Sequence, residues 1–276
     1  MDQDLTAPSR YRFTEYSIDT RFADQVYDGT GDFMIRMPST LRNVIRIALT
    51  SVEIPLVEYT FSARRGNLRV TDSLSIPAGN YTATGLATAV ATTTGFTCTY
   101  DLSSNRFTLG AGTYNLLSPD ATIAARTKDW GLGFNLGFKK SQLNAAGNIT
   151  LGSSTVAPNS PSLGPATYYL LQLQCPDMMD NTVHRVSAGG SVPAFAKVVL
   201  RSPGFYQVQF DDGANLVRKE NTFAQPTSIA ALRVRLVDAY GCTVDMGETD
   251  WSMTFEVMEV VSATLYGELN RAYGTR

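Results

Sequence analysis

The alternation of apolar and polar residues is most regular in the segment 43–61, NVIRIALTSVEIPLVEYTF. Its first part places Ile45, Ile47 and Leu49 on one face. A period of two over this length predicts a half-buried β-strand. At Ser51 the phase slips, and Val52 and Ile54 become the apolar positions. One extra residue reverses the facing of all that follow, so the slip predicts a β-bulge; Pro55, which lacks an N–H, predicts the strand's end.

The second half of the chain predicts one strand after another. Alternating or continuous apolar runs occupy 169–175, 194–200, 206–210 and 232–236. The most regular strand is the last, where Trp251, Met253, Phe255 and Val257 alternate with polar residues. We expect this strand to pair with the bulged one, which would join the two ends of the chain in one closed two-sheet sandwich.

Between these halves the pattern changes to a small mixed module. A short strand with Leu74 and Ile76 precedes a turn at 77–80. A helix is predicted over Thr84–Thr94, with Thr84 as N-cap and Gly95 at the C-terminal cap. The strands 96–100 and 106–109 then form a hairpin. Strand, helix and hairpin together predict an inserted βαββ subdomain.

Two further segments complete the insertion. The stretch 129–138, DWGLGFNLGF, has no preceding strand and no capped helix after it, which argues against a phosphate-binding loop. Its glycines are expected to turn the chain while its aromatic residues hold the loop to the subdomain core. The Gly-, Ser- and Pro-rich stretch 150–167 is expected to be an exposed connection back to the sandwich.

The predicted organisation is therefore mainly β, a single jelly-roll sandwich with an inserted βαββ subdomain. Residues 31–62 and 166–276 form the sandwich, beginning with a strand over Phe33–Met37, and residues 63–165 form the insertion. Residues 1–30 mix aromatic and arginine residues without a clear period. They are expected to be an N-terminal arm, which lies either on its own domain or on a neighbouring subunit.

Composition narrows the class of protein. Of 276 residues, 43% are hydrophobic and 17% charged, which is typical of a globular chain. The net charge of −2 provides no basic field for nucleic acid. Three cysteines without a CxxC spacing indicate neither a disulfide framework nor a zinc site, and buried free thiols in a reducing compartment are expected. No signal peptide and no span of about 18 apolar residues is visible, so a soluble protein made in the cytosol is expected.

No residue pattern predicts a catalytic, cofactor or metal site. His184 is the single histidine and has no GxSxG motif with it, so a structural or surface role is favoured. Oxygen-rich loops can hold Ca²⁺, but the acidic loops here match ordinary turns better than the twelve-residue calcium pattern. These loops contain Asp245, Glu248 and Asp250, and Asp211 with Asp212.

The remaining candidates are isolated side chains. Four glutamates on strand faces give no way to choose a pair for glycoside hydrolysis: Glu53, Glu58, Glu256 and Glu259. The basic pairs Arg64–Arg65 and Lys139–Lys140 are expected in solvated loops. Asn80 and Asn148 match the glycosylation pattern, which without a secretory signal is expected to be chance. A non-enzymatic structural or binding protein is therefore predicted.

A resemblance sharpens this prediction. The segment FMIRMPSTLRNVIRIALTSVEIPLVEYTFS resembles the opening strands of minor capsid and penton-type jelly-roll proteins of nucleocytoplasmic large DNA viruses, the group that includes the chlorella viruses. The stretches SIPAGNYTATGLATAV, FTCTYDLSSNRFTL and LGFNLGF resemble a βαββ module of virion proteins of these viruses. The closing RVRLVDAYGCTVDMGETDWSMTFEV is similar to their final hairpin.

The resemblance implies a structural protein of an icosahedral virion. Such a protein occupies the capsid vertex as a pentamer, or lies under the major-capsid shell and cements its capsomers. Its expected partners are the major capsid protein, other minor capsid proteins and further copies of itself, without nucleic acid, cofactor or membrane span. Two alternatives stay open. One is a glycan-binding attachment module with Tyr114, Tyr168 or Tyr206 as sugar platforms, and the other is a β-sandwich hydrolase.

Overall fold

The computed structural model describes residues 11–175, 182–185, 191–200, 208–211 and 220–261, with only the backbone of 182–185 and 208–211. The chain divides into two compact units. The first unit comprises Met1–Glu58 and Ala166–Arg276, and the second unit comprises Tyr59–Pro165. Residues 59–62, expected in the sandwich, belong to the second unit because Phe61 pairs with Gly79 and lies in that unit's core.

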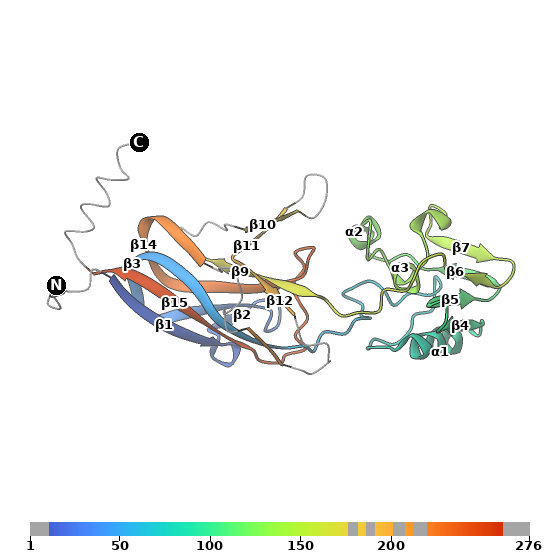
Figure 1. Cartoon of the computed structure of the whole chain (residues 1–276), viewed down its shortest axis with the longest axis horizontal. Helices are drawn as coiled ribbons and strands as arrows, with labels where there is room; N and C mark the ends of the chain where they lie inside the picture. Colours follow the sequence, from blue (N-terminus) through green and yellow to red (C-terminus); the bar gives the residue numbers. More distant parts are fainter. Residues whose placement is uncertain (1–10, 176–181, 186–190, 201–207, 212–219, 262–276) are drawn as a thin grey trace, which may run out of the picture. The chain divides into compact units, whose positions relative to one another are not determined.

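The first unit is built almost wholly of antiparallel strands (Figure 1). Its elements are β1 (Tyr11–Asp19), the short 3₁₀ helix η1 (Thr20–Phe22), β2 (Gln25–Val26), β3 (Asp32–Pro55), β9 (Tyr168–Gln174), β10 (Thr182–Arg185), β11 (Ser191–Ala194), β12 (Ala196–Val199), β13 (Val208–Asp211), β14 (Glu220–Val237) and β15 (Ser252–Val260). The strand order is β1-β15-β3-β14-β9-β12, and β2 and β13 also pair with β3.

Two long strands carry this sheet through both layers of a sandwich. β3 and β14 pair from Glu220↔Ala48 to Arg235↔Asp32. The second half of β3 also pairs with β15, and the last part of β14 pairs with β9, so the two layers diverge from one ribbon. Both layers contribute to one buried apolar core, which includes Ile47, Val52, Phe255, Leu171, Val198 and Leu236. The mainly β, jelly-roll fold class predicted from the sequence is confirmed.

The predicted pairing of the first long strand with the last one is confirmed, including the bulge. β15 pairs with β3 from Ser252↔Glu53 onward. Thr254 lies opposite Ser51 and the next residue, Phe255, lies opposite Leu49, so Thr50 is the extra residue. The slip brings Val52 to full burial beyond the bulge. β3 then ends at Pro55, as expected.

The start of this strand differs from the prediction. Met258 lies opposite Arg46 and Glu259 opposite Val44, so a second irregularity falls at Ile45. Val44 is fully buried there and Ile45 is only partly buried, because the extra residue turns Ile45 away from the core. The separate strand expected over Phe33–Met37 is the first part of the same 24-residue β3.

Residues 11–30 do not form the expected arm. β1 pairs with β15 over nine residues, from Tyr11↔Val260 to Asp19↔Ser252. Tyr16 stacks on Phe255 at 5.7 Å between ring centroids, and Ile18 lies in the core. The inward-facing positions at the start of β1 are polar, which conceals the period of two in the sequence.

β9 is buried on both faces, whereas the sequence predicted one apolar face. Leu171 and Leu173 face the main core. Leu170, on the opposite face, packs with Val192 and Ala194 of β11 in a small separate cluster. The hairpin of β10 and β11 therefore covers part of the outer side of the sheet.

The second unit contains short helices and small sheets. Its elements are α1 (Ala83–Thr94), β4 (Cys98–Asp101), β5 (Arg106–Leu109), β6 (Gly112–Asn115), α2 (Ala121–Ala124), α3 (Leu132–Leu136), η2 (Lys140–Gln142), β7 (Asn148–Leu151) and β8 (Thr155–Val156). β4, β5 and β8 form one sheet, and β6 and β7 form another. They enclose their own apolar core around Phe61, Leu86, Phe107, Tyr114, Trp130 and Leu136.

The inserted module follows the predicted order with local differences. α1 and the hairpin of β4 and β5 lie where they were expected, and Gly95 ends α1 with φ 72°. Thr82, rather than Thr84, caps α1, because its hydroxyl accepts the Gly85 N–H. The strand expected around Leu74 consists of an isolated bridge between Arg69 and Ser75.

Two loop predictions are partly wrong. Trp130 and Phe138 are buried, as expected, but α3 forms between them. Gly133 allows this turn because a Cβ there would lie 2.4 Å from the Trp130 ring. The connection expected over 150–167 contains the end of β7 and all of β8, since its short alternating segments add to the two small sheets.

Inserting an alanine between Ser51 and Val52 should destabilise the first unit strongly. The insertion shifts the later residues of β3 by one position, so Val52 and Ile54 would face solvent, at a cost of about 3 to 6 kcal/mol in the free energy of unfolding. The control Thr50→Ala keeps the register and loses only the hydroxyl's bond to the Thr254 carbonyl, about 1 kcal/mol. Urea unfolding followed by circular dichroism measures both, and equal stability of the two variants would contradict the role of the bulge.

Candidate functional site

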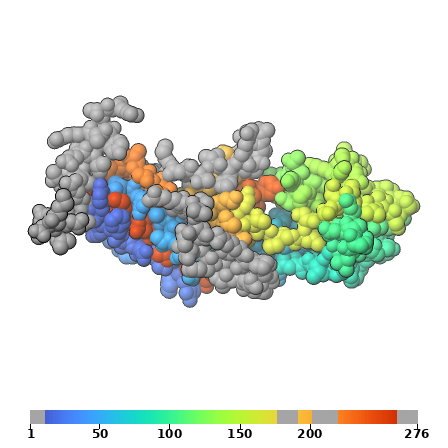
Figure 2. All heavy atoms as spheres, in the orientation of Figure 1, coloured from blue at the N-terminus to red at the C-terminus, as the bar shows by residue number. Residues whose placement is uncertain are grey.

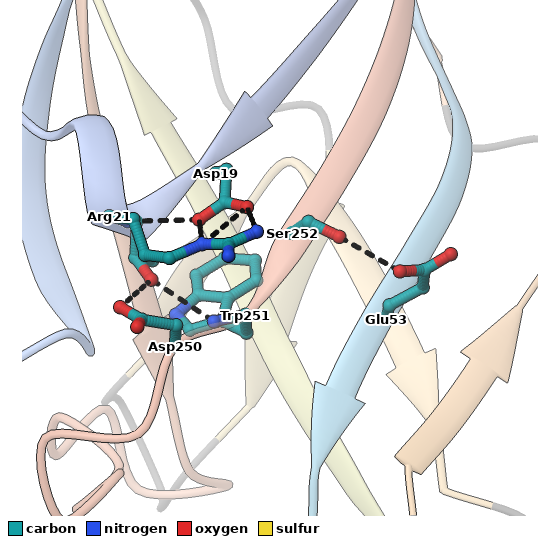
Figure 3. A network of polar contacts seen from close by, with 7 residues as sticks. Asp19, Arg21, Glu53, Asp250, Trp251 and Ser252 are labelled. Carbon is teal, nitrogen blue, oxygen red and sulfur yellow. Dashed lines mark hydrogen bonds and ion pairs between the residues drawn. The ribbon is translucent and has the colours of Figure 1, made fainter.

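A polar groove of about 380 Å³ in the first unit is the candidate site with the most side-chain chemistry. It lies where β1 passes into η1, beside the end of β3 and the start of β15 (Figure 3). The side chains that line it include Asp19, Arg21, Glu53, Asp250 and Ser252. Asp19, Glu53 and Ser252 come from three strands that the β3–β15 and β1–β15 pairings bring together. Arg21 lies in η1, and Asp250 lies in the loop before β15.

Each carboxylate of the groove is held by a neighbour. Asp19 accepts from the Arg21 guanidinium at 2.5 Å, and this hydrogen bond is the main reason that the pKa of Asp19 is lowered. The Thr20 hydroxyl donates to Asp250 at 2.9 Å, and the Ser252 hydroxyl donates to Glu53 at 3.0 Å (Figure 3). These hydrogen bonds hold the turn after β1 against the neighbouring strands.

Trp251 connects this turn to the sheet. Its backbone N–H donates to the Thr20 hydroxyl at 3.0 Å, and its indole N–H donates to the Thr30 carbonyl at 2.7 Å. Its ring meets Phe33 edge-on at 5.8 Å. The groove floor is thus continuous with the core, and its geometry depends on the fold rather than on a mobile loop.

A second charged group lies at the opposite end of β1. Glu259 is buried at 2% exposure and accepts from the Arg12 guanidinium at 2.7 Å and from the Arg42 backbone N–H at 3.2 Å. A pocket of about 240 Å³ lies here, and its lining includes Arg12, Thr40, Arg42, Asn43, Glu259 and Val260. The carboxylate at this position joins β1, β3 and β15.

Two further ion-pair groups join strands across the outer faces of the sandwich. Arg46 of β3 contacts Glu220 of β14 at 3.1 Å and also contacts Glu256 of β15. Asp32 of β3 receives two hydrogen bonds from Arg233, at 2.8 and 2.7 Å, and contacts Arg235 at 3.1 Å. None of these groups was anticipated from the sequence, since each joins residues far apart in the chain.

The structure separates the four glutamates considered for hydrolysis. Glu53 contacts Ser252, Glu256 contacts Arg46, and Glu259 contacts Arg12. Glu58 accepts from the Tyr169 hydroxyl at 3.2 Å. Glu53, Glu256 and Glu259 therefore serve different contacts between strands, and Glu58 serves one between a loop and a strand. Within the described residues, the structure brings no two of them together as a hydrogen-bonded pair.

The acidic loops act as turns where they are described. Asp245 accepts the Gly247 N–H at 3.0 Å, and Glu248 has φ 62°. In the described part of the chain, no three His, Cys, Asp or Glu residues are grouped to hold a metal ion. Asp211 ends β13, and its side chain and all of Asp212 lie outside the described residues. His184 lies on β10 opposite Val192, and its side chain also lies outside them.

The sugar platform of the alternative function was assigned to three tyrosines, of which the structure describes two. Tyr114 is fully buried, because it faces the core of the second unit and its hydroxyl donates to the Gly110 carbonyl. Tyr168, in the first unit, lies under the Lys197 ammonium at 4.0 Å. Tyr206 lies outside the described residues.

Three other surface candidates have structural contacts. The Lys140 ammonium, expected in solvent, donates to the carbonyls of Ala124 and Arg126 at the end of α2. The Asn80 side chain accepts the Thr60 N–H at 2.8 Å. Arg65 donates its backbone N–H to Ser62. These polar residues hold loops of the second unit in place.

The three cysteines differ in exposure. Cys98 is buried, Cys175 is intermediate and Cys242 is exposed, so the expectation of buried thiols holds only for Cys98. Burial raises the pKa of the Cys98 thiol to about 12. Among the described helices, none is long and apolar enough to cross a membrane.

Comparison with known proteins gives a single kind of match. No protein-family model and no curated protein matches the chain. Seven chains of solved structures match it, and one of them is the crystal structure of the selenomethionine-labelled mavirus penton protein. That match has 9% sequence identity and a TM-score of 0.45, and it covers 90% of this chain and 98% of the other. A likeness at this level carries no conclusion about function, partners or assembly.

Replacing Asp32 should cost more stability than replacing Asp19, although each contacts arginine twice. The Asp32 side chain is 5% exposed, so Asp32→Asn leaves a partly enclosed arginine pair without its counter-charge, and we expect a loss of about 2 to 3 kcal/mol in the free energy of unfolding. The control Asp19→Asn breaks a solvated pair and should change little. Equal effects of the two variants in urea unfolding would contradict this difference.

Cysteine alkylation at pH 8 should distinguish Cys98 from Cys242. The thiolate is the reacting species, and the raised pKa keeps Cys98 protonated in the folded chain. Iodoacetamide should therefore modify Cys242 first, and Cys98 only after unfolding, as read by peptide mass spectrometry. The Cys98 thiol ionises at lower pH in the unfolded chain than in the folded one. The free energy of unfolding should therefore fall as the pH rises above the ordinary pKa of a thiol. Equal labelling of the native protein would contradict the burial.

Proposed function

We propose that this protein is a non-enzymatic structural component of an icosahedral viral capsid. Within the capsid it is either the penton at the vertex or a minor protein that cements major-capsid capsomers from beneath the shell. Its partners are further copies of itself, the major capsid protein and other minor capsid proteins, and it resides in the virion. The mavirus protein is by its name a penton, the same class of protein, but its distant likeness to this chain gives the proposal no weight.

One observation carries the proposal. The two segments that resemble the opening strands and the closing hairpin of penton-type proteins are β3 and the chain from the end of β14 through β15. They are hydrogen-bonded neighbours at the centre of one jelly roll, in the order β15-β3-β14. The third resembling stretch falls in the inserted unit, around α1, β4, β5 and α3. The resemblance thus follows the architecture and does not rest on scattered short matches.

The geometry of the charged residues agrees with this role. Asp19 of the groove pairs with Arg21 in the turn after β1, and the carboxylates at Arg46 and at Arg12 are engaged in contacts between strands. Polar groups used in this way stabilise the sandwich and leave the strand edges and loops for contacts with other proteins. A shell multiplies many weak contacts of this kind into a stable assembly.

The mass of the purified protein and its association with particles test the proposal. Native mass spectrometry should give a closed ring of five copies for a vertex protein. A cement protein should be found as a single copy that binds assembled capsid shells. In either case the protein should copurify with virions through a density gradient. A protein that is absent from virions and does not bind shells would contradict the capsid role.

The two rival functions give different outcomes in the same preparations. A monomer retained on a sugar column would favour the attachment module, and turnover of a glycoside that is lost on Glu53→Gln would favour a hydrolase. Glu53→Gln keeps the size of the side chain and can still accept from Ser252, so it is a mild substitution for a structural residue. We expect neither result.

A further inference from the structure

β1 is an edge of the first unit's sheet. It stands at the end of the strand order, and within the described residues it pairs with β15 alone. The pairing is regular over all nine residues, without a bulge. Figure 2 shows this part of the chain, in dark blue, at the surface of the unit. An edge of this length offers a row of backbone N–H and C=O groups to another strand.

β1 lacks several of the features that protect sheet edges, although it contains the charged residues Arg12, Glu15 and Asp19. It contains no proline and no lysine, and it is not short. The strand at the other end of the order, β12, has only four residues and contains Lys197. Of these two edges, β1 is the one open to a further strand.

The outer face of β1 has an exposed aromatic ring near its start. Tyr16 and Ile18 turn towards the core, and Phe13 lies on the opposite face. Phe13 is 54% exposed and lies across from Met258 of β15. Glu15, two residues on, is exposed and lies across from Glu256, so two carboxylates already face each other in this row.

We propose that β1 pairs antiparallel with β1 of a second copy, around a two-fold axis at Phe13. In such a pair each residue lies opposite one on the same face, and the residue at the axis lies opposite itself. An axis at Arg12 would oppose two guanidinium groups. An axis at Glu15 would place two more carboxylates in the row that already contains Glu256.

The register with the axis at Phe13 gives compatible side-chain pairs on both faces of the strand. It places the two Phe13 rings together, an aromatic cross-strand pair that stabilises antiparallel sheets. It also sets Arg12 opposite Thr14 and Tyr11 opposite Glu15, so no like charges meet. An axis at Thr14 would instead set each Phe13 ring against the Glu15 carboxylate of the other copy. The self-complementarity of this short sequence identifies a second copy as the occupant of the edge.

This contact does not rest on the capsid role. It is an isologous contact, which joins two copies or, where the protein also forms rings, two rings. Copurification with virions therefore tests the capsid role, and the mass and cross-linking of the variants below test the β1 contact. Either can fail while the other holds.

A charge placed at Phe13 should separate the copies. Phe13→Lys sets two ammonium groups against each other at the axis, and Phe13 is exposed, so the fold should be kept. The control Ser17→Lys adds the same charge to the same strand and face, but Ser17 lies four residues from the axis, so the two added charges do not meet. By sedimentation velocity, Phe13→Lys should halve the mass of the wild-type particle and Ser17→Lys should not. A wild-type mass that Phe13→Lys leaves unchanged, or that both variants reduce alike, would overturn the proposal.

Disulfide cross-linking tests the register itself, in a Cys242→Ser background that removes the exposed native thiol. Residues opposite each other in an antiparallel pair have Cα atoms about 4.5 to 5.5 Å apart, within reach of a disulfide. Two Ser17 residues would be about 27 Å apart in the proposed register. Under mild oxidation Phe13→Cys should give a cross-linked dimer and Ser17→Cys should not. Equal cross-linking of the two, or none, would show that the edge is covered in another way.

Discussion

The pairing of β3 with β15 on one side and β14 on the other is the constraint on which the first unit depends. β3 is 24 residues long, and its two halves belong to different layers of the sandwich. A strand can serve both layers only if its apolar side chains stay on the inner side along its whole length. The irregularities at Ile45 and Thr50 achieve this, because each changes the facing of the residues that follow. Val44, Ile47, Val52 and Ile54 are therefore all fully buried.

Ion pairs join neighbouring strands of the first unit, as the apolar contacts of its core do. Arg46 joins β3 to β14 and β15, Asp32 joins β3 to β14, and Glu259 joins β15 to β1 and β3. Each pair lies across neighbouring strands, so the charged residues fix which strands lie side by side. A sheet held in this way keeps a rigid polar surface.

The sequence predicts the parts of this fold that leave a periodic signature. The alternation in β15, the phase slip near Ser51 and the helix ending at Gly95 all gave elements that the structure contains. The slip at Ile45 leaves no signature, because Val44 and Ile45 are both apolar and either could face inward. β1 was missed because Arg12 pairs with a carboxylate 247 positions away, and such a partner cannot be read from the local pattern.

The order of the chain has a consequence for how the protein is made. The second unit is one continuous stretch with its own core, so it can fold as soon as residues 59–165 leave the ribosome. The sandwich cannot close then, since β3 pairs with β15, the last strand of the described residues. β3 must wait, with an apolar face uncovered, while about 200 residues are synthesised, on the order of 10 to 40 s. In a cell, chaperones or other chains can therefore bind the exposed face of β3 until β15 has been synthesised and pairs with it.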